Sequence, residues 1–440
     1  MTTPVNVRPF RGDRPWRRDR DLTFGSIVHV NEKGGSFGGT EEYIALVTSA
    51  LASRGVRSHL VCGVVSGALP DSLESVHIVE ALASRHPLPG AGEQLAGLLA
   101  RLDADVIYLH NVFDPAVVSS VAALPGRGAL LWYVHDHYLT CLSELRWRRD
   151  IGSCPQCLGH DCLVAIGEGH CVLRYPDETL DGADLDVRVS LSQSLAEVDA
   201  IVVVSDYMRS LLRDALPHLD GRLHRLTRPI RDLGDPPRRR RRRPDDPAIV
   251  TYAGRITAEK GLAVVIEALG TIESDASIEL HVAGVVESDS YWAHCQRLQL
   301  SAISANPRLS VTYLGHLDYD AIDEQFRQSD IVTIPSQWPE PLGAVALEAM
   351  SAGAAVIASN AGGLNDTLVH DHNGLHVDPY DITAWATAIT SLLQDPARAN
   401  RLGQQGHRDF SGLAIDDHLA DLDHLITTRA HRSADGHTGG

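Results

Sequence analysis

The sequence predicts an α/β protein made of two doubly wound domains that face a cleft. A chain of 440 residues exceeds what one hydrophobic core usually organises. Short apolar runs alternate with amphipathic stretches in two separate series, which is typical of repeated β-α units and a parallel sheet. A segment dominated by Pro, Arg and Asp separates the two series and fits an exposed linker.

The first domain is expected over residues 22–228, followed by the linker at 229–247. Apolar runs predict its strands at 24–30, 58–62, 76–79, 106–110, 130–135 and 201–205. A cysteine-rich insertion interrupts the pattern at 137–176.

The second domain is expected over residues 248–410. Its predicted strands are 249–253, 279–283, 310–314, 331–335, 355–358 and 375–377, with helices between them such as 262–269 and 342–352. Residues 411–426 predict a last helix that packs back, and 1–21 and 427–440 have the composition of disordered tails.

Charge and hydropathy narrow the function classes. A formal net charge of −18 argues against a nucleic-acid binder, which needs a basic face. No apolar stretch approaches the ~20 residues that span a bilayer, and the polar start has no apolar signal region, so we expect a cytoplasmic protein. Arginines 238–243 and the 14–20 segment can contact an anionic membrane at its inner face, or be a solvated linker and tail.

The first glycine-rich motif, N-E-K-G-G-S-F-G-G-T-E-E-Y at residues 31–43, is expected to follow the first strand and open a helix. Glycines let backbone N–H groups approach an anion at a helix N-terminus. A tight strand-to-helix connection explains the motif equally well.

A second motif, A-G-R-I-T-A-E-K-G at 253–261, follows a predicted strand in the second domain. Arg255 and Lys260 can flank a diphosphate from this position. The chain has only two lysines, Lys33 and Lys260, and each lies in one of these motifs.

The segment 335–353, P-S-Q-W-P-E-P-L-G-A-V-A-L-E-A-M-S-A-G, places Glu340 in a loop and Glu348 two turns along a predicted helix. Glu348 can accept hydrogen bonds from a ribose diol, and Glu340 can meet a sugar hydroxyl. A further glycine turn at 359–366 also follows a strand. Ligands of doubly wound sheets bind beyond the carboxyl ends of the strands, so we expect a nucleotide where these loops converge.

In this order and spacing, the motifs resemble the retaining glycosyltransferases of family four. The resemblance covers about residues 22–425 and rests on Gly254-Arg255, Glu259-Lys260-Gly261, the E-x7-E pair Glu340 and Glu348, and Gly362-Gly363. It implies the GT-B fold of two Rossmann-like domains, an N-terminal one for the acceptor and a C-terminal one for a nucleotide sugar. The implied reaction moves a hexose from a UDP- or GDP-linked donor to a hydroxyl of a glycan, glycolipid or small metabolite, as in polysaccharide biosynthesis.

The same resemblance implies roles for individual residues. Arg255 and Lys260 would hold the donor diphosphate, Glu348 the ribose, and Glu340 the 3- or 4-hydroxyl region of the sugar. Backbone amides of three successive residues would add contacts to phosphate and sugar: Leu342, Gly343 and Ala344.

In the first domain, Gly38 and Gly39 match the family's glycine loop beside the phosphates. His135, followed by Asp136, matches the histidine near the C6 hydroxyl of the donor sugar and the acceptor. His135, Glu340, Arg255 and Lys260 are therefore the implied catalytic set. Asp366 departs from the family, which often has Glu there. Members need no bound metal for catalysis and retain configuration at the transferred sugar.

The insertion after His135 contains five of the seven cysteines: Cys141, Cys154, Cys157, Cys162 and Cys171. In a cytoplasmic protein this density, with interspersed His160 and His170, indicates structural zinc or an iron–sulfur cluster. The four-ligand set expected is Cys154, Cys157 and Cys162 with either Cys141 or Cys171. Redox disulfides and unligated thiols are the alternatives.

Two other classes of function are open. A phosphorylase or epimerase would share the fold, but the E-x7-E arrangement disfavours an epimerase, and no lysine beyond the two named is available to bind pyridoxal phosphate. A catalytically silent regulator that binds sugar nucleotide or metal is the second alternative, and the intact set of charged motif residues argues against it.

Overall fold

The computed structural model describes residues 22–35, 38–175, 179–231, 246–273, 276–410 and 415–435. Within them the chain forms two compact units. One comprises residues 22–229 with 338–342 and 418–435, and the other comprises the remainder from residue 230 to residue 417. Both arginine tracts, most of the linker and the first tail lie outside the described residues.

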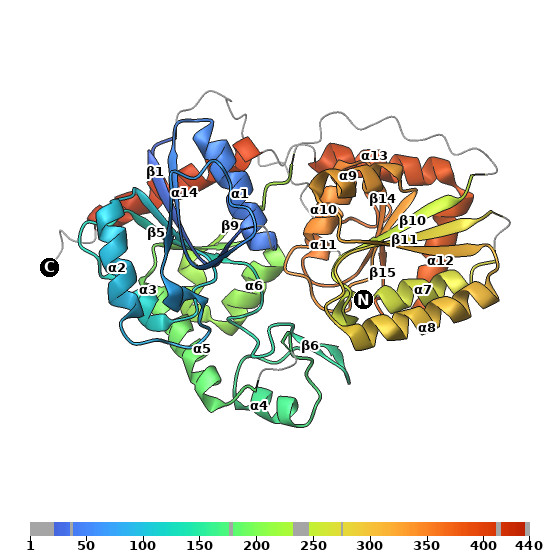
Figure 1. The fold of residues 1–440 in the computed structure, drawn as a ribbon, viewed down its shortest axis with the longest axis horizontal. Coiled ribbons are helices and arrows are strands. Elements are labelled where there is room, and N and C mark those ends of the chain that lie inside the picture. The colour runs from blue at the N-terminus through green and yellow to red at the C-terminus, as the bar shows by residue number, and fades with distance from the viewer. Residues whose placement is uncertain are drawn as a thin grey trace. The chain divides into compact units, whose positions relative to one another are not determined.

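The first unit contains a parallel sheet in the order β3-β2-β1-β4-β5-β8-β9. Figure 1 labels β1, β5 and β9 of this sheet. Its strands are β1 (Ser26–Gly35), β2 (Arg57–Ser66), β3 (Ser75–Ile78), β4 (Val106–Leu109), β5 (Ala129–Val134), β8 (Ala200–Val203) and β9 (Leu223–Arg225). Its helices are α1 (Gly39–Ala52), η1 (Glu80–Ala83), α2 (Ala91–Leu102), α3 (Pro115–Ala122), α5 (Gly182–Ser194), η2 (Leu195–Glu197), α6 (Asp206–Ala215) and η3 (Pro217–Arg222). The three-residue strand β9 is too short to stand out as an apolar run.

Strand β1 is longer than predicted, and this corrects the placement of the first glycine motif. The polar residues after Val30 end the apolar run, but pairing with β2 continues through Lys33 opposite Val64 to Gly35 opposite Ser66. Gly35 has φ +130°, and a Cβ there would lie 1.7 Å from the Ser66 carbonyl oxygen. The first part of the motif is therefore strand, and the helix begins at Gly39.

The second unit contains a parallel sheet in the order β12-β11-β10-β13-β14-β15. Its strands are β10 (Ala248–Ala253), β11 (Ile278–Ala283), β12 (Leu309–Gly315), β13 (Ile331–Ile334), β14 (Ala355–Ser359) and β15 (Leu375–Val377). Its helices are η4 (Ala258–Lys260), α7 (Leu262–Gly270), α8 (Asp289–Ala305), α9 (Tyr319–Gln328), α10 (Ala344–Ser351), α11 (Leu364–Thr367), α12 (Ile382–Gln394) and α13 (Pro396–Phe410). Val265, Leu280, Trp385 and Ile389 are fully buried between sheet and helices.

The last helix, α14 (Ile415–Asp435), continues past residue 426, where the sequence predicted its end. Leu419, Leu422 and Ile426 are buried at helical spacing. His418 Nε2 lies 2.8 Å from the Tyr43 hydroxyl, and Thr23 donates to Asp423 at 2.6 Å. These contacts attach the end of the chain to the first unit.

The cysteine-rich insertion forms a small substructure with a two-stranded antiparallel hairpin and one helix: β6 (Trp147–Arg148), β7 (Gly152–Ser153) and α4 (His160–Gly167). None of the helices among the described residues has the length and apolar character needed to cross a membrane.

Candidate active site

Both sheets reverse their strand order at one point, and the motifs follow the strands at these points. In the second unit the reversal lies between β10 and β13, which pair through Tyr252 and Thr333. Strand β14 follows β13. The loops after β10, β13 and β14 carry the three motifs, so they leave one sheet edge at the position where doubly wound sheets bind ligands.

Arg255 lies at the start of the loop after β10 and is oriented by two carboxylates. Its Nη1 is 2.7 Å from Glu287 Oε2, and its Nη2 is 3.2 Å from Glu259 Oε1. The Thr257 hydroxyl donates to the same Glu259 oxygen at 2.6 Å. The guanidinium group is partly exposed, at 31% of its side-chain surface, so it is preoriented and accessible to an anion.

Lys260 ends the single turn of η4, which packs against the loop after β13. The Gln337 N–H donates to the Glu259 carbonyl at 2.7 Å. Gly261 has φ +73°, and a Cβ on it would lie 2.0 Å from the Pro335 carbonyl oxygen. The η4 turn that carries Lys260 and the loop after β13 therefore contact each other through their backbones. Only glycine permits this approach at position 261.

The N-terminus of α10 lies at the same edge. Gly343 precedes the helix with φ +82° and, as a glycine, provides no side-chain cap for the N–H groups of the first turn, which begins at Ala344. Glu348 is half-buried on the second turn. Because of the left-handed Gly343, the helix begins two residues later than predicted. In the neighbouring loop, Gly362 has φ +60° and Gly363 precedes α11, which carries Asp366.

The first unit gathers its predicted residues around the reversal between β1 and β4. Gly38 and Gly39 begin α1 after β1. The buried Asn31 side chain connects this region by accepting from the Asn111 N–H at 3.2 Å and donating to Glu41 at 2.9 Å. A Cβ on Gly39 would lie 3.1 Å from Arg228 Nη1. The glycine turn is thus closely packed at the carboxyl end of the sheet.

Three histidines form a hydrogen-bonded chain across β1, β4 and β5. His29 Nδ1 lies 2.9 Å from His110 Nε2, and His110 Nδ1 lies 3.0 Å from His135 Nε2. His29 and His110 are buried, whereas His135 is partly exposed at the end of the chain of rings. Desolvation lowers the pKa of His29 and of His135 to about 3, so both rings are neutral near pH 7.

Glu340 belongs to the first unit, because the segment 338–342 packs there. His137 Nε2 lies 2.7 Å from the Pro339 carbonyl, and the Ser205 hydroxyl donates to the Pro341 carbonyl at 2.5 Å. Burial lowers the pKa of His137 to about 4, although the Glu340 charge opposes that shift. Glu340 is therefore close to the segment that begins at His135.

The predicted site residues thus form two groups. Gly38, Gly39, His135, Glu340 and Leu342 lie in the first unit, whereas Arg255, Lys260, Gly343, Ala344 and Glu348 lie in the second.

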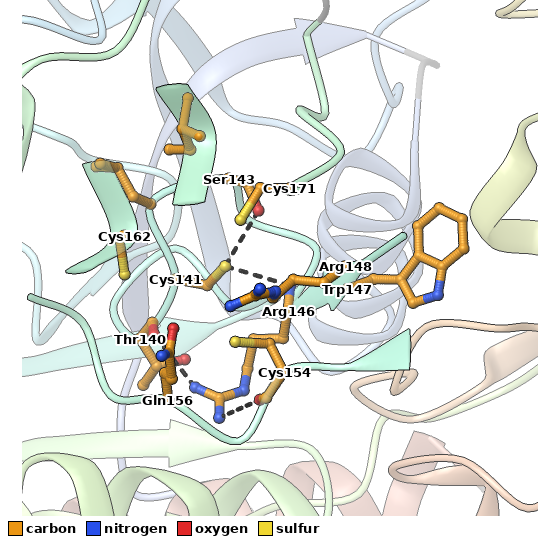
Figure 2. Close-up of a pocket in the computed structure, with 12 residues that line it drawn as sticks. Thr140, Cys141, Ser143, Arg146, Trp147, Arg148, Cys154, Gln156, Cys162 and Cys171 are labelled. Carbon is orange, nitrogen blue, oxygen red and sulfur yellow. Dashed lines mark hydrogen bonds between the residues drawn. The ribbon is translucent and has the colours of Figure 1, made fainter. Parts of the chain in front are cut away.

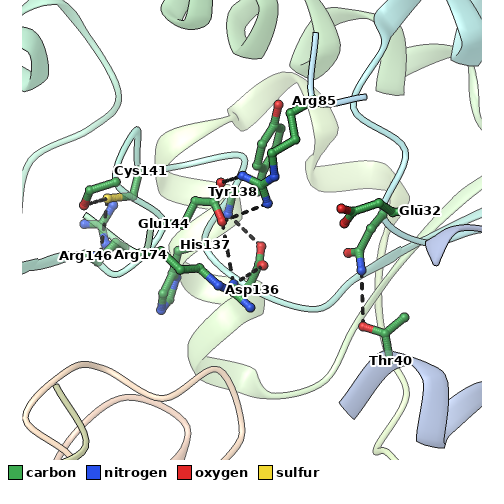
Figure 3. Close-up of polar contacts among 12 residues, drawn as sticks. Glu32, Thr40, Arg85, Asp136, His137, Tyr138, Cys141, Glu144, Arg146 and Arg174 are labelled. Atoms are coloured by element: carbon green, nitrogen blue, oxygen red, sulfur yellow. Dashed lines mark hydrogen bonds and ion pairs between the residues drawn. The ribbon is translucent and has the colours of Figure 1, made fainter. Parts of the chain in front are cut away.

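Sequence reasoning missed a partly buried charge network in the segment that follows His135 (Figure 3). Arg174 Nη1 lies 2.8 Å from Asp136, and the Tyr138 N–H donates to the same carboxylate at 2.9 Å. Burial alone would raise the pKa of Asp136, but the Arg174 charge and the Tyr138 N–H outweigh burial and lower the pKa. Glu144, whose side chain is 2% exposed, pairs with Arg85 and, at 3.1 Å, with Arg188. No local sequence pattern predicts ion pairs between residues so far apart in the chain.

Four of the five clustered cysteines line one small cavity in the insertion: Cys141, Cys154, Cys162 and Cys171 (Figure 2). Cys157 is exposed and does not line it. Burial raises the pKa of Cys171 to about 11, and the neighbouring Cys141 and Cys154 thiols add to this rise. In the described part of the chain, no three His, Cys, Asp or Glu side chains already stand at metal-binding spacing.

Two family models match the chain and together cover most of it. "Glycosyltransferase Family 4" matches residues 37–231, and "Glycosyl transferases group 1" matches residues 236–409.

Individual relatives agree with these models. An uncharacterized glycosyltransferase of Methanocaldococcus jannaschii is 32% identical over 36% of this chain, and the alignment spans only 39% of that relative. The D-inositol 3-phosphate glycosyltransferase of Stackebrandtia nassauensis is 28% identical over 88% of this chain and 86% of its own length. Among solved structures, Anabaena Alr3699/HepE in complex with UDP-glucose superposes with a TM-score of 0.61 at 16% identity, covering 90% of this chain and 98% of that one.

Proposed function

Because the chain belongs to the family 4 glycosyltransferases, we propose that it transfers a hexose with retention from a nucleoside-diphosphate sugar to a hydroxyl acceptor. The family assignment and the two doubly wound α/β domains expected from the sequence are confirmed. The observation that carries the proposal is the convergence of Arg255, Lys260 and the start of α10 at one edge of the second sheet.

We assign the donor diphosphate to Arg255, Lys260 and the N–H groups at the start of α10. Two cations and a helix N-terminus supply the charge that a leaving diphosphate needs without a metal ion. Glu348, on the second turn of α10, is suited to accept hydrogen bonds from the ribose hydroxyls. Glu340 and His135 are assigned to the sugar and the acceptor hydroxyl.

The reaction then depends on positioning and electrostatics. As the bond to the diphosphate breaks, the acceptor hydroxyl attacks the face from which the nucleotide leaves, and a donor phosphate oxygen takes its proton. His135 is neutral near pH 7, so it serves as a hydrogen-bonding partner for a hydroxyl rather than as a cation.

UDP-linked glucose is the first donor to test, because Anabaena Alr3699/HepE, which shares the fold, was solved with it. The inositol phosphate relative makes a small phosphorylated polyol the first acceptor to test. Glycan and glycolipid acceptors, and membrane contact through the arginine tracts, are proposals from the sequence.

The test is calorimetric titration of the purified chain with UDP, GDP and ADP, followed by assay of the matching nucleotide sugars. We expect micromolar binding of one nucleotide, weakened tenfold or more, about 1.4 kcal/mol, by Lys260→Ala and by Glu348→Ala. Arg297→Ala removes an exposed cation on α8 and is the matched control, expected to bind like wild type. A folded protein that binds none of the nucleotides contradicts the proposal.

A further inference from the structure

The backbone of the insertion brings four distant cysteines to one place. Cys141 lies in the turn after His137, Cys154 follows β7, and Cys162 lies in the first turn of α4. Cys171 pairs across a β-bridge with Arg148 of β6. Since β6 also pairs with β7, one small hairpin holds these segments together.

The cavity that they line has the size of a single ion. Its volume is about 20 Å³, close to that of one water-sized sphere. All four thiol side chains are half-buried. A cysteine has one side-chain torsion, so each sulfur atom can change its direction by rotation about Cα–Cβ without a movement of the backbone.

The charges around the cavity fit a metal thiolate site. The Arg146 N–H donates to Cys141 Sγ at 3.2 Å, a contact that stabilises a thiolate. Arg146 and Arg148 line the cavity, and no carboxylate does. Four thiolates around a divalent ion leave two negative charges. The Arg146 guanidinium lies beside them, whereas the Arg148 guanidinium is paired with Asp150 at 2.6 Å.

The turn around Cys141 has a strained backbone. Glu144 and Arg146 are non-glycine residues with φ +65° and +47°, both within the turn that wraps around Cys141. Beyond Trp147 the described part of the insertion is built from small elements, since its strands are two residues long, its helix has eight residues, and Ile151 and Val164 are exposed. Small substructures of this kind are usually held by a metal or by disulfides.

We propose that Cys141, Cys154, Cys162 and Cys171 bind one structural zinc ion, and that Cys157 is not a ligand. Zinc is tetrahedral, prefers sulfur ligands, and in structural sites takes four protein ligands with no open position.

The site also orders the segment that follows His135. Arg174, three residues after Cys171, reaches both Asp136 at 2.8 Å and Glu144 at 3.6 Å (Figure 3). Arg188 Nη1 donates to the Tyr138 and Cys141 carbonyls at 2.9 Å each. Zinc bound to the four cysteines therefore holds both Cys141 and Cys171, which are the two ends of the segment. Arg174, just after Cys171, extends the polar contacts of this segment to Asp136.

The direct experiment measures metal content of the full chain purified in the presence of a thiol reductant. We expect about one zinc per chain by elemental analysis. Cys154→Ser and Cys162→Ser are expected to lose it, and Cys157→Ser, the matched control three residues from Cys154, is expected to keep it. Replacement by cobalt in the wild-type chain is expected to give the absorption bands of tetrahedral tetrathiolate Co²⁺, so the result does not depend on a variant that folds.

Several outcomes overturn the proposal. Detection of iron together with inorganic sulfide would mean that the cysteines bind an iron–sulfur cluster instead of a single zinc ion. Four protons missing from the mass of metal-free protein would mean two disulfides instead. Loss of zinc in Cys157→Ser equal to that in Cys154→Ser would refute the ligand set.

The expected effect of the zinc site on catalysis, through the segment that follows His135, rests on the proposed function. It is therefore measured separately from the metal content. Zinc removal by a chelator is expected to lower kcat and raise the KM for acceptor while nucleotide binding by calorimetry stays unchanged. Zinc content without transferase activity would refute the proposed function and leave the metal site intact.

Discussion

Nδ1 of His110 lies 3.0 Å from Nε2 of His135, and the other nitrogen of the His110 ring lies 2.9 Å from Nδ1 of His29. Burial and the two neighbouring rings lower the pKa of His110, so near pH 7 its ring is neutral and carries one N–H. It therefore donates to one neighbour and accepts from the other. The tautomer of His135 is in this way coupled to that of a buried residue in β1.

Replacing His110 tests whether this coupling serves catalysis. His110→Phe keeps an aromatic ring but loses both hydrogen bonds, and we expect kcat to fall about tenfold, the value of one such bond. His110→Asn keeps a polar atom near the position of Nδ1 and is expected to recover most of that loss. The measurement is kcat and KM across pH. Equal losses in the two variants would mean that His110 only fills space.

Acid should destabilise the first unit through two of its histidines, whose pKa is low in the folded chain. The pKa of His29 and His135 is about 3 in the folded chain, far below the ordinary value of 6.5. Between these values the unfolded chain binds protons that the folded chain excludes, so the free energy of unfolding falls as pH decreases, by about 1.4 kcal/mol per pH unit for each histidine. Urea denaturation at several pH values measures the slope.

A matched pair of variants assigns that slope. His29→Phe removes one buried titrating ring and is expected to reduce the slope by one proton. His86→Gln, at a side chain 73% exposed, is expected to leave it unchanged. A stability that does not vary between about pH 4 and 6.5 would contradict the assignment.

The buried Glu144 is expected to be essential for stability. Glu144→Gln removes the charge that pairs with Arg85 and Arg188, leaving the buried Arg188 and the half-buried Arg85 guanidinium groups unbalanced. We expect a loss of about 3–5 kcal/mol in the free energy of unfolding. Asp214→Asn breaks an exposed pair with Arg213 and should change stability by less than about 0.5 kcal/mol. Similar effects of the two substitutions would show that Glu144 is not buried as described.

Gly343 is expected to tolerate no side chain. It has φ +82°, and a Cβ there would lie 2.3 Å from Leu364 Cδ2. Gly343→Ala is expected to lower the free energy of unfolding for two reasons. The left-handed backbone costs an alanine about 1–2 kcal/mol, and overpacking against Leu364 costs about 1–3 kcal/mol. At Gly126 φ is +69° with open space around the Cβ position, so Gly126→Ala should show only the backbone cost. Thermal denaturation compares the two, and a larger loss at Gly126 would be inconsistent with this geometry.

Much of the fold was predictable because strand formation here is a local property. The buried strands are continuous apolar runs, so β10 to β15 were placed within one residue of their ends. The errors fall where pairing or packing decides: β1 extends to Gly35 through its pairing with β2, and α10 begins late because Gly343 is left-handed. The very short β6, β7 and β9 have no periodic signal at all.

The sequence by itself determined the two series of β-α units, the glycine turns, the cations Arg255 and Lys260, and the spacing of Glu340 and Glu348, because each is encoded in a short stretch of chain. Only the tertiary structure decided which distant side chains meet. Strand order places β4 between β1 and β5, and this brings His29, His110 and His135 into one hydrogen-bonded chain. Hairpin pairing likewise directs Cys141, Cys154, Cys162 and Cys171 to one cavity and leaves Cys157 exposed, since contacts between residues far apart in sequence depend on how strands pair rather than on spacing along the chain.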